Sequence, residues 1–351
     1  MDSKKILAIV AVAIIAVGTV VAVVMLTNNE KGDLSVAYLQ KNGYETQMVA
    51  QSKGYFGDYG LNVTGVTVTG SGQDAVNKLL AGEVDIAATG QGPVANTFHN
   101  YSDDLVVLCG VNHSTGGQVW VTTNPNLVAY NKATDNQAEV LASFATESDN
   151  GANPIKFGCQ QDATTASEFK GWLKAMGIKF VDFDNDPTGE EYVQLVHYKA
   201  NTLVATLAAG TIDGMAASQP FPAKALSTVA NARQIGTNAD VDSYDLSMYI
   251  TTKKVYDEKK DLLEKFLKAL NKASKFMADE KNLEECITIC NAEINNEDAV
   301  KEAFKIAVWK TAWSDDMANT LFKTCEKKKY TEITLQMCKD KCPFTDVLSK
   351  F

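Results

Sequence analysis

Short apolar strands alternate with amphipathic helices along most of this sequence, and the alternation starts twice. The first series has strand patterns at 34–39, 62–68 and 84–89, and the helix patterns between them end at glycines. The second series begins with the strand pattern at 155–159. Strands that alternate with helices need crossover connections, which predicts a mostly parallel sheet. Two such series predict two α/β lobes side by side.

The same patterns predict where the lobes begin and end. We expect lobe 1 to comprise residues 34–123 and 219–280, and lobe 2 to comprise residues 124–218. After residue 252 the sequence has few strand formers and many acid–base pairs at helical spacing. We therefore expect residues 281–351 to form a helical, cysteine-rich C-terminal extension, and residues 1–33 to form a membrane anchor and a linker.

The anchor is predicted from an apolar run over residues 6–26, which only Gly18 and Thr19 interrupt. At 1.5 Å per residue such a helix is long enough to cross the hydrocarbon core of a bilayer. Lys4 and Lys5 precede it, so the N-terminus is expected in the cytoplasm and the rest of the chain outside, on the cell membrane. A cleaved signal peptide is the alternative, but its apolar region is usually shorter and ends in small residues.

The charge balance limits the classes of partner. Lysine and arginine number 33 against 43 aspartates and glutamates, giving a formal charge of −10. Nucleic-acid binding needs a basic face, so this composition argues against it. Arginine occurs once, at Arg233, so we expect an anionic ligand to be held mainly by lysine, backbone N–H groups and hydroxyls.

Small or hydroxyl residues stand directly before predicted helices at 70–73, 89–92 and 161–165. The free N–H groups and the positive end of a helix bind anions or polar groups there, although simple capping of the helix is the alternative for each loop. All three loops follow strands. Because the carboxyl ends of parallel strands meet at one edge of a sheet, together they predict a shared cleft.

No signature of catalysis or metal binding is found. The histidines, His99, His113 and His197, have no metal-binding spacing. The sequence also has no nucleophile elbow, no P-loop and no dinucleotide fingerprint. We therefore predict a protein that is not an enzyme and has no metal or cofactor.

Cysteines recur at a spacing of one helical turn in the C-terminal region. Cys286 and Cys290 lie on one predicted helix, and Cys338 and Cys342 on another. If these helices run antiparallel, the disulfides Cys286–Cys342 and Cys290–Cys338 are expected, and an exported position permits them. A four-thiolate metal or iron–sulfur site is the alternative, although the spacing differs from the usual pairs. Cys325 leaves a different pairing open.

Four segments resemble a known family. They are VAYLQKNGYETQMVAQSKGYFGDYGLNV at 36–63, GSGQDAVNKLLAGEVDIAATGQGP at 70–93, GCQQDATTASEFKGWLKAMGI at 158–178 and LAAGTIDGMAASQPFPAKA at 207–225. In order and spacing they are similar to the substrate-binding proteins of ABC importers for nitrate, sulfonate, taurine and bicarbonate. The resemblance covers roughly residues 34–256.

The resemblance implies a two-lobed α/β type II periplasmic-binding fold that closes about a hinge on a small ligand. It implies an extracytoplasmic protein that captures a small polar or anionic organic solute, such as a sulfonate or taurine-like compound, nitrate or a carboxylate. An ABC permease and its ATPase subunits would be the partners. By position, the ligand contacts would fall on Gln40, Asn42, Tyr44, Ser71, Gly72, Gln73, Thr89, Gly90, Gln91, Gln161, Thr164, Thr165 and Gln219.

Two other functions stay open at this point. The same fold hosts binding proteins for thiamin-pyrimidine precursors and synthase-like enzymes, which would use a lysine-bound cofactor with cysteines and a histidine in the cleft. The cysteines here cluster in the C-terminal region instead, which argues against that enzyme. A redox or sensory ectodomain that uses the paired cysteines is the other alternative.

Overall fold

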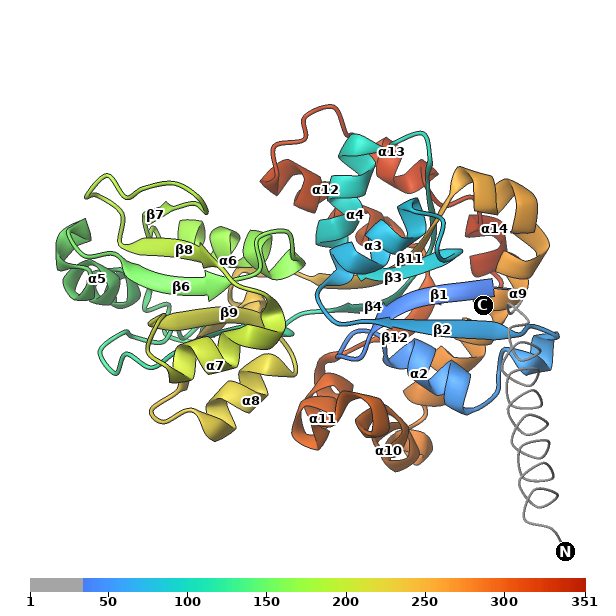
Figure 1. The fold of residues 1–351 in the computed structure, drawn as a ribbon, viewed down its shortest axis with the longest axis horizontal. Coiled ribbons are helices and arrows are strands. Elements are labelled where there is room, and N and C mark those ends of the chain that lie inside the picture. Colours follow the sequence, from blue (N-terminus) through green and yellow to red (C-terminus); the bar gives the residue numbers. More distant parts are fainter. Residues whose placement is uncertain (1–33) are drawn as a thin grey trace, which may run out of the picture.

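A computed structural model describes residues 34–351 and consists of two α/β lobes (Figure 1). Each lobe is built on a six-stranded sheet flanked by helices. The prediction of two α/β lobes is therefore confirmed. The membrane anchor predicted over residues 6–26 lies outside the described residues.

The sheet of lobe 1 has the strand order β12-β4-β11-β3-β1-β2. Its strands are β1 (Leu34–Leu39), β2 (Val63–Val68), β3 (Ile86–Gly90), β4 (Leu105–Ser114), β11 (Asp245–Thr252) and β12 (Trp309–Ala312). β1 is parallel to β2 and β3, whereas β11 is antiparallel to both β3 and β4, and β12 is antiparallel to β4. The sheet is mixed rather than mostly parallel, because β11 returns from lobe 2 and β12 returns from the C-terminal helices.

The sheet of lobe 2 repeats this arrangement with the order β10-β5-β9-β6-β8-β7. Its strands are β5 (Gln118–Thr122), β6 (Ile155–Cys159), β7 (Phe180–Val181), β8 (Val193–His197), β9 (Gly214–Ser218) and β10 (Arg233–Thr237). β6 is parallel to β8 and β9, as β1 is to its neighbours, and β5 is antiparallel to β9, as β11 is to β3. Each lobe thus contains one strand supplied by a crossing between the lobes.

Helices cover both faces of the sheets (Figure 1). Those of lobe 1 are α2 (Glu45–Ser52), α3 (Gly72–Leu80), α4 (Gln91–Asn100) and α9 (Lys253–Ala278), and those of lobe 2 are α5 (Gln137–Glu147), α6 (Thr164–Ala175), α7 (Leu203–Ala208) and α8 (Phe221–Thr228). The C-terminal region adds α10 (Leu283–Ile294), α11 (Glu297–Ile306), α12 (Asp315–Lys327), α13 (Leu335–Asp340) and α14 (Thr345–Leu348). In α9, Leu263, Phe266, Leu267 and Leu270 are fully buried, and this spacing makes one apolar face that packs on the lobe 1 core.

The crossings between the lobes lie at 115–117 and 238–244. The boundaries expected at 123/124 and 218/219 therefore differ from the structure, because residues 118–123 and 219–237 belong to lobe 2. The reason is strand pairing: β5 forms hydrogen bonds with both β9 and β10, so all three strands belong to the second sheet. An apolar strand pattern does not by itself reveal which sheet the strand joins.

Residues 281–351 form part of lobe 1 rather than an extension packed on its surface. β12 bonds directly to β4. Side chains such as Cys286, Phe344 and Leu348 are buried in the same core as β1 and β3. Removing this region would expose the lobe 1 core.

The two disulfides expected from the cysteine spacing are not formed, because all seven cysteines are free and buried. Cys286 and Cys290 lie on α10, which packs on α2, whereas Cys338 lies on α13, which packs on α12. α10 and α13 lie on opposite sides of the sheet in Figure 1. The side chain of Cys338 instead contacts Cys325, and Cys342 donates a hydrogen bond to the Leu108 carbonyl oxygen at 3.4 Å.

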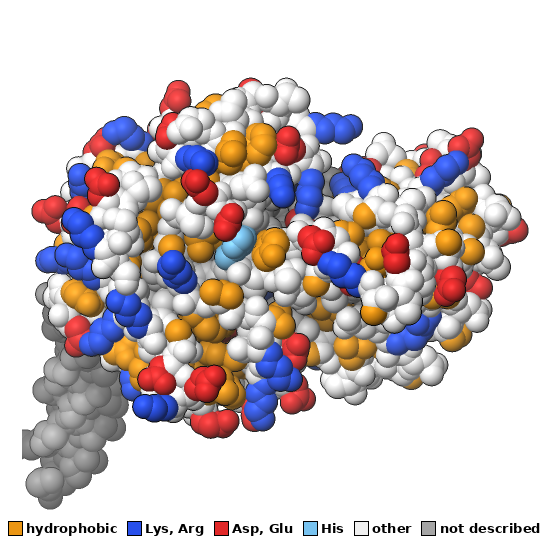
Figure 2. Space-filling view, turned by 180° about the vertical axis from the view of Figure 1, so that it is seen from behind, with side chains coloured by type: hydrophobic (Ala, Val, Ile, Leu, Met, Phe, Trp, Pro, Cys, Tyr) orange, Lys and Arg blue, Asp and Glu red, His pale blue; other side chains and the backbone are white. Residues whose placement is uncertain are grey.

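The surface carries charges of both signs. On the face drawn in Figure 2, lysine and arginine side chains are interspersed with acidic ones over both lobes, and no large basic area is present. Among residues 34–351 no helix combines the length and the apolar character needed to cross a bilayer.

Candidate functional site

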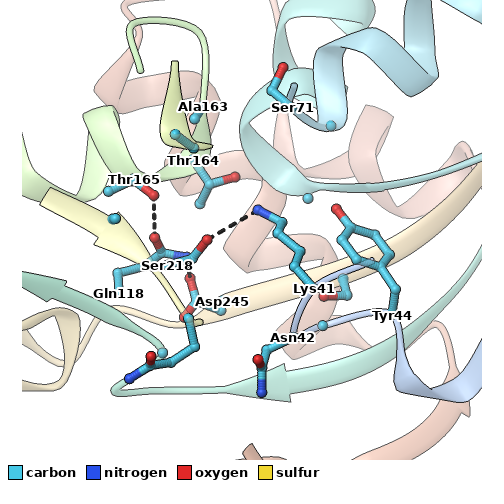
Figure 3. Close-up of a pocket in the computed structure, with 18 of the residues that line it drawn as sticks. Lys41, Asn42, Tyr44, Ser71, Gln118, Ala163, Thr164, Thr165, Ser218 and Asp245 are labelled. Atoms are coloured by element: carbon cyan, nitrogen blue, oxygen red, sulfur yellow. Dashed lines mark hydrogen bonds between the residues drawn. The ribbon is translucent and has the colours of Figure 1, made fainter. Parts of the chain in front are cut away.

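A cavity of about 100 Å³ lies between the two lobes (Figure 3). The loops around it follow β1 and β3 of lobe 1 and β6 and β9 of lobe 2. The carboxyl ends of these strands thus face one another across a cleft, where open α/β sheets place their ligand sites. We refer to this cavity as the interlobe cleft.

The structure brings most of the sequence-predicted contact residues together in the interlobe cleft. Those that line it are Asn42, Tyr44, Ser71, Gly72, Gly90, Gln91, Thr164, Thr165 and Gln219. They come from both lobes, so a molecule bound there would touch both. Their role as ligand contacts stays a prediction.

The other predicted residues lie outside the lining. Gln40 and Gln161 are exposed, one residue away from positions that do line the cleft. The side chain of Gln73 runs along α3 and bonds to Asn77 with its amide nitrogen at 3.1 Å. Thr89 is buried and lies against Gly72. A Cβ added at Gly72 would clash with the Thr89 hydroxyl. The residues implied by the resemblance lie in loops beside the cleft, but a shift of one residue decides whether a side chain lines it.

Sequence reasoning did not assign Lys41, Gln118, Ser218 or Asp245, which also line the cleft. Lys41 extends from the loop after β1 across the cleft, and its ammonium group donates a hydrogen bond to Ser218 Oγ at 3.1 Å (Figure 3). Lys41 stands between two predicted residues, so its neighbours were a usable signal. Asp245 begins β11, where the chain re-enters lobe 1, and no local pattern marks it.

The carboxylate of Asp245 is held by one donor from lobe 2 and one from the crossing between the lobes. Gln118 Nε2 donates to its Oδ1 at 2.9 Å, and Asn238 Nδ2 donates to its Oδ2 at 3.3 Å. Gln118 also accepts a hydrogen bond from the Thr165 hydroxyl in the first turn of α6. This chain of hydrogen bonds fixes the side chains on the lobe 2 wall of the cleft.

Helix N-termini differ in their availability to a ligand. Ser71 caps α3 with its side chain, and Asp74 bonds back to the Ser71 N–H in a capping box, so this end is already satisfied. α4 begins after Gly90 and α6 after Ala163, and neither cap residue supplies a side-chain hydrogen bond. The positive end of α6 therefore faces the cleft without a side-chain cap from its own cap residue, whereas in the first turn of α4 the Gly92 N–H donates to the Thr164 hydroxyl of lobe 2.

Burial shifts the acid–base behaviour of the charged groups in and near the cleft. Desolvation lowers the pKa of Lys41 to about 8, against the attraction of Asp245, which raises it. Burial, together with the negative charge of Glu168, raises the pKa of Asp245 to about 7. Burial likewise raises the pKa of Glu45, behind the cleft at the start of α2, to about 7.

The lobes touch directly beside the cleft. The backbone N–H of Gly92 donates to Thr164 Oγ1 at 3.0 Å, and both groups are buried. A Cβ at Gly92 would lie 2.8 Å from the backbone nitrogen and Cα of Thr164. The glycine therefore permits the close approach of α4 in lobe 1 to α6 in lobe 2.

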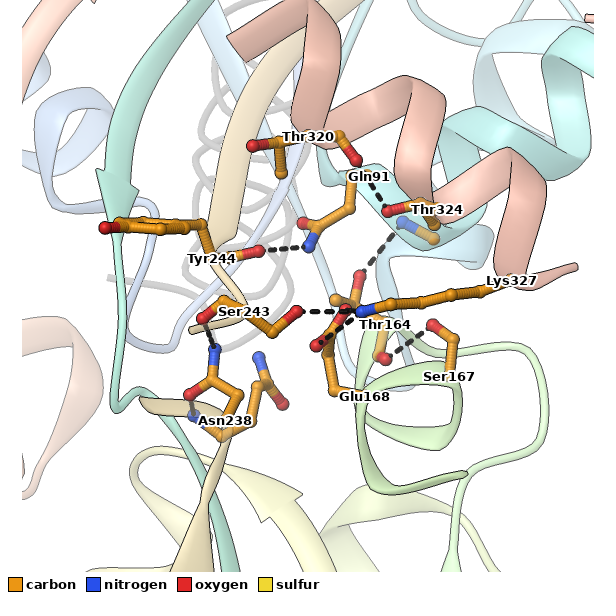
Figure 4. Close-up of polar contacts among 12 residues, drawn as sticks. Gln91, Thr164, Ser167, Glu168, Asn238, Ser243, Tyr244, Thr320, Thr324 and Lys327 are labelled. Carbon is orange, nitrogen blue, oxygen red and sulfur yellow. Dashed lines mark hydrogen bonds and ion pairs between the residues drawn. The ribbon is translucent and has the colours of Figure 1, made fainter. Parts of the chain in front are cut away.

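A second contact between the lobes lies behind the cleft, where α12 meets α6 (Figure 4). The ammonium group of Lys327 on α12 lies 3.0 and 3.1 Å from the carboxylate oxygens of Glu168 on α6. It also donates to Ser243 Oγ at 2.8 Å. The side chain of Glu168 is only 1% exposed, and that of Lys327 is 32% exposed. We call this group, Lys327, Glu168 and Ser243, the interlobe ion pair.

Arg233 does not line the cleft. Its guanidinium donates to the carbonyl oxygens of Asn124 and Pro125, at 3.0 and 3.1 Å, and to that of Leu127. It therefore fixes the loop that follows β5. Within residues 34–351, no group of three or more His, Cys, Asp or Glu side chains is arranged to hold a metal ion.

Two lobes, two crossings and a cleft between the carboxyl ends of both sheets define a periplasmic-binding fold. Among solved structures, the nitrate-binding protein NrtA from Synechocystis PCC 6803 matches with a TM-score of 0.70 at 15% identity, over 90% of this chain and 87% of that one. The alkanesulfonate-binding protein SsuA from Xanthomonas axonopodis pv. citri, bound to MOPS, matches with a TM-score of 0.65 at 12% identity, over 90% and 96%. At these identities the likeness concerns the fold.

The family follows from the sequence. The model of the NMT1-like family matches residues 27–291, and the chain belongs to that family. A ligand-binding component of an ABC-type import system from Staphylococcus aureus, with zinc bound, has a TM-score of 0.66 at 13% identity, over 90% of this chain and 98% of that one. Comparison with curated proteins found no match.

Proposed function

We propose that this protein is an extracytoplasmic solute-binding protein of an ABC importer. It captures a small polar or anionic organic solute in the interlobe cleft and delivers it, chemically unchanged, to a permease with its ATPase subunits. The observation that carries the proposal is the cleft itself, which is lined from both lobes by polar side chains and by the N-terminus of α6, whose cap residue supplies no side-chain hydrogen bond. A solute bound there would hold the lobes together.

The family and the structural neighbours support the same function. NrtA is a nitrate-binding protein and SsuA an alkanesulfonate-binding protein, so small oxyanions are the first ligands to test here. A sulfonate or taurine-like compound, nitrate or a carboxylate would meet Lys41 and hydroxyl groups rather than an arginine. The apolar run over residues 6–26 would tether the protein to the membrane.

The two alternatives receive less support. Among the described residues that line the cleft there is a lysine but no cysteine or histidine, so the cluster expected of a synthase-like enzyme is missing. For a redox ectodomain, the thiols would need a low pKa and access to solvent. Burial instead raises the pKa of Cys286 to about 11 and that of Cys342 to about 12.

The test is a search for bound solute on residues 34–351. Native mass spectrometry would look for a co-purified ligand, and calorimetry would measure the binding of nitrate, sulfonates and carboxylates. Small-angle X-ray scattering on the same samples would follow lobe closure. Saturable binding of one solute accompanied by a more compact particle supports the proposal. The proposal fails if no solute co-purifies and no probe binds, and an absorbance band of a lysine-linked cofactor would favour the enzyme instead.

A further inference from the structure

Two opposite charges share the interlobe cleft without touching each other. Lys41 reaches in from lobe 1, and Asp245 lies at the return crossing into lobe 1. Within the described chain, no ion pair joins them: Lys41 bonds to Ser218, and Asp245 is held by Gln118 and Asn238. Each charge nevertheless alters the pKa of the other, so they lie within electrostatic range.

Both groups keep bonding capacity for a ligand. An ammonium group has three N–H donors, and Ser218 uses one of those on Lys41. A carboxylate offers about four acceptor positions, and two donors reach Asp245. A buried charge without a partner is costly. A ligand with a single negative charge would satisfy Lys41 and leave Asp245 with a repulsive neighbour.

Part of the cleft lining is apolar. Ala303, Ile306 and Ala307, at the end of α11, line the cleft, as do Ala217 and Leu246. Asn42, next to Lys41, donates a hydrogen bond to the Ala299 carbonyl oxygen of α11 at 2.8 Å, which fixes this helix against the cleft loop. With a cavity of about 100 Å³, the space suits a ligand of few atoms with a short apolar middle.

We propose that the cleft selects a small zwitterionic solute. Its acidic group lies at Lys41, its ammonium group lies at Asp245, and a short aliphatic spacer packs on the end of α11. This inference rests on the proposed function and narrows its ligand class to compounds that carry both charges. Asp245 is then the residue that discriminates an amino-acid-like solute from a simple anion of the same size.

Matched pairs of probes test this on the unmodified ectodomain. 2-Aminoethanesulfonate and 1-propanesulfonate have nearly the same shape and differ by an ammonium against a methyl group, and 3-aminopropanoate and butyrate form the corresponding carboxylate pair. Calorimetry should show that one zwitterion, at least, binds tenfold or more tightly than its methyl analogue. A methyl analogue that binds as tightly as its zwitterion overturns the inference while leaving solute capture intact.

Variants locate the discrimination. In Asp245→Asn the advantage of the zwitterion should fall to threefold or less, whereas Lys41→Met should weaken both members of a pair by at least tenfold. The matched controls are Asp242→Asn and Lys132→Met, since these exposed residues pair with each other on the surface. An unchanged preference in a folded Asp245→Asn protein overturns the assignment.

Failure of all four probes also overturns the zwitterion inference. Native mass spectrometry of the co-purified solute then decides separately whether solute capture survives. Thermal unfolding of each variant without ligand shows that a lost preference does not reflect a lost fold. No step of this test depends on knowing the natural solute.

Discussion

Replacing Lys327 by methionine should loosen the two lobes, because it leaves Glu168 buried without a cation. The Glu168 side chain is 1% exposed and bonds to Lys327 through both carboxylate oxygens. Loss of one partner from a fully buried pair costs about 3–5 kcal/mol, and a fully exposed pair is worth about 0–1 kcal/mol. Lys327 is 32% exposed, so we expect an intermediate cost of about 2 kcal/mol.

Separation of the lobes would relieve this cost, since the Glu168 carboxylate could then be hydrated. The penalty should therefore act mainly on closure and not on unfolding of either lobe. A cost of about 2 kcal/mol corresponds to a change of about 30-fold in the ratio of closed to open protein. A ligand that binds the closed form would lose affinity by up to the same factor.

Small-angle X-ray scattering of the unliganded variant should show a larger radius of gyration, and calorimetry with a bound solute should show a weaker affinity. Lys323→Met is the matched control, because Lys323 lies one turn earlier than Lys327 on α12 and makes no ion pair among the described residues. The double variant Lys327→Met/Glu168→Gln should recover part of the loss. An unchanged scattering profile and affinity together with a full drop in urea stability would refute the role in closure, since the pair would then only stabilise the fold.

Three further results are expected. Gly92→Ala should weaken solute affinity several-fold in calorimetry, because the Cβ of the alanine would lie 2.8 Å from the backbone of Thr164. Gly57→Ala is the control, because a Cβ there meets nothing within 4 Å. Glu45→Gln should stabilise the unliganded protein at pH 8 and much less at pH 4. The pKa of Glu45 in the folded protein, about 7, exceeds the ordinary 4.5, so the stability that the protonated acid contributes at low pH is lost as the pH rises through 7. Urea unfolding at both pH values would measure this. The buried thiols should resist a thiol reagent in native protein and all seven should react after unfolding without reductant, whereas fewer than seven would reveal disulfides.

Local patterns in the sequence predicted the elements that bear on the cleft. The strands that became β2, β3 and β6 were predicted from short β-branched or apolar runs, and the glycines and hydroxyl residues that follow them mark the start of α3, α4 and α6. Loops at the carboxyl ends of such strands meet at one edge, which is why the pattern alone predicted that the loops holding Ser71, Gln91 and Thr164 share a cleft; the choice of these residues came from the family resemblance. Strand runs, glycines and helix caps are signals between neighbouring residues, so a single sequence is enough to predict them.

Other features depend on pairing across long sequence distances. Residues 124–153 are rich in polar residues and show no clear helical pattern, yet they contain α5, whose buried Val140 and Phe144 make only a narrow apolar face. β12 joins the lobe 1 sheet although it lies within residues 281–351, a region that was expected to be helical. Asp245 lies in the cleft only because β11 returns between β3 and β4. These contacts are set by tertiary packing, which overrides local pattern.

The C-terminal region acts on the cleft from two sides, which explains why its removal would alter binding as well as stability. α11 contributes the apolar side chains of Ala303 and Ile306 to the cleft lining, so it would limit the length of a solute bound there. α12 supplies Lys327, which contacts Glu168 on α6. Glu168 lies one turn after Thr164, which lines the cleft. Because Thr164 and Glu168 are four residues apart on one helix, they share a face, and this face turns toward lobe 1. Any rotation of α6 that parts the lobes must break the Gly92–Thr164 hydrogen bond and the Lys327–Glu168 contact together, so capture of the solute and formation of the interlobe ion pair should be coupled.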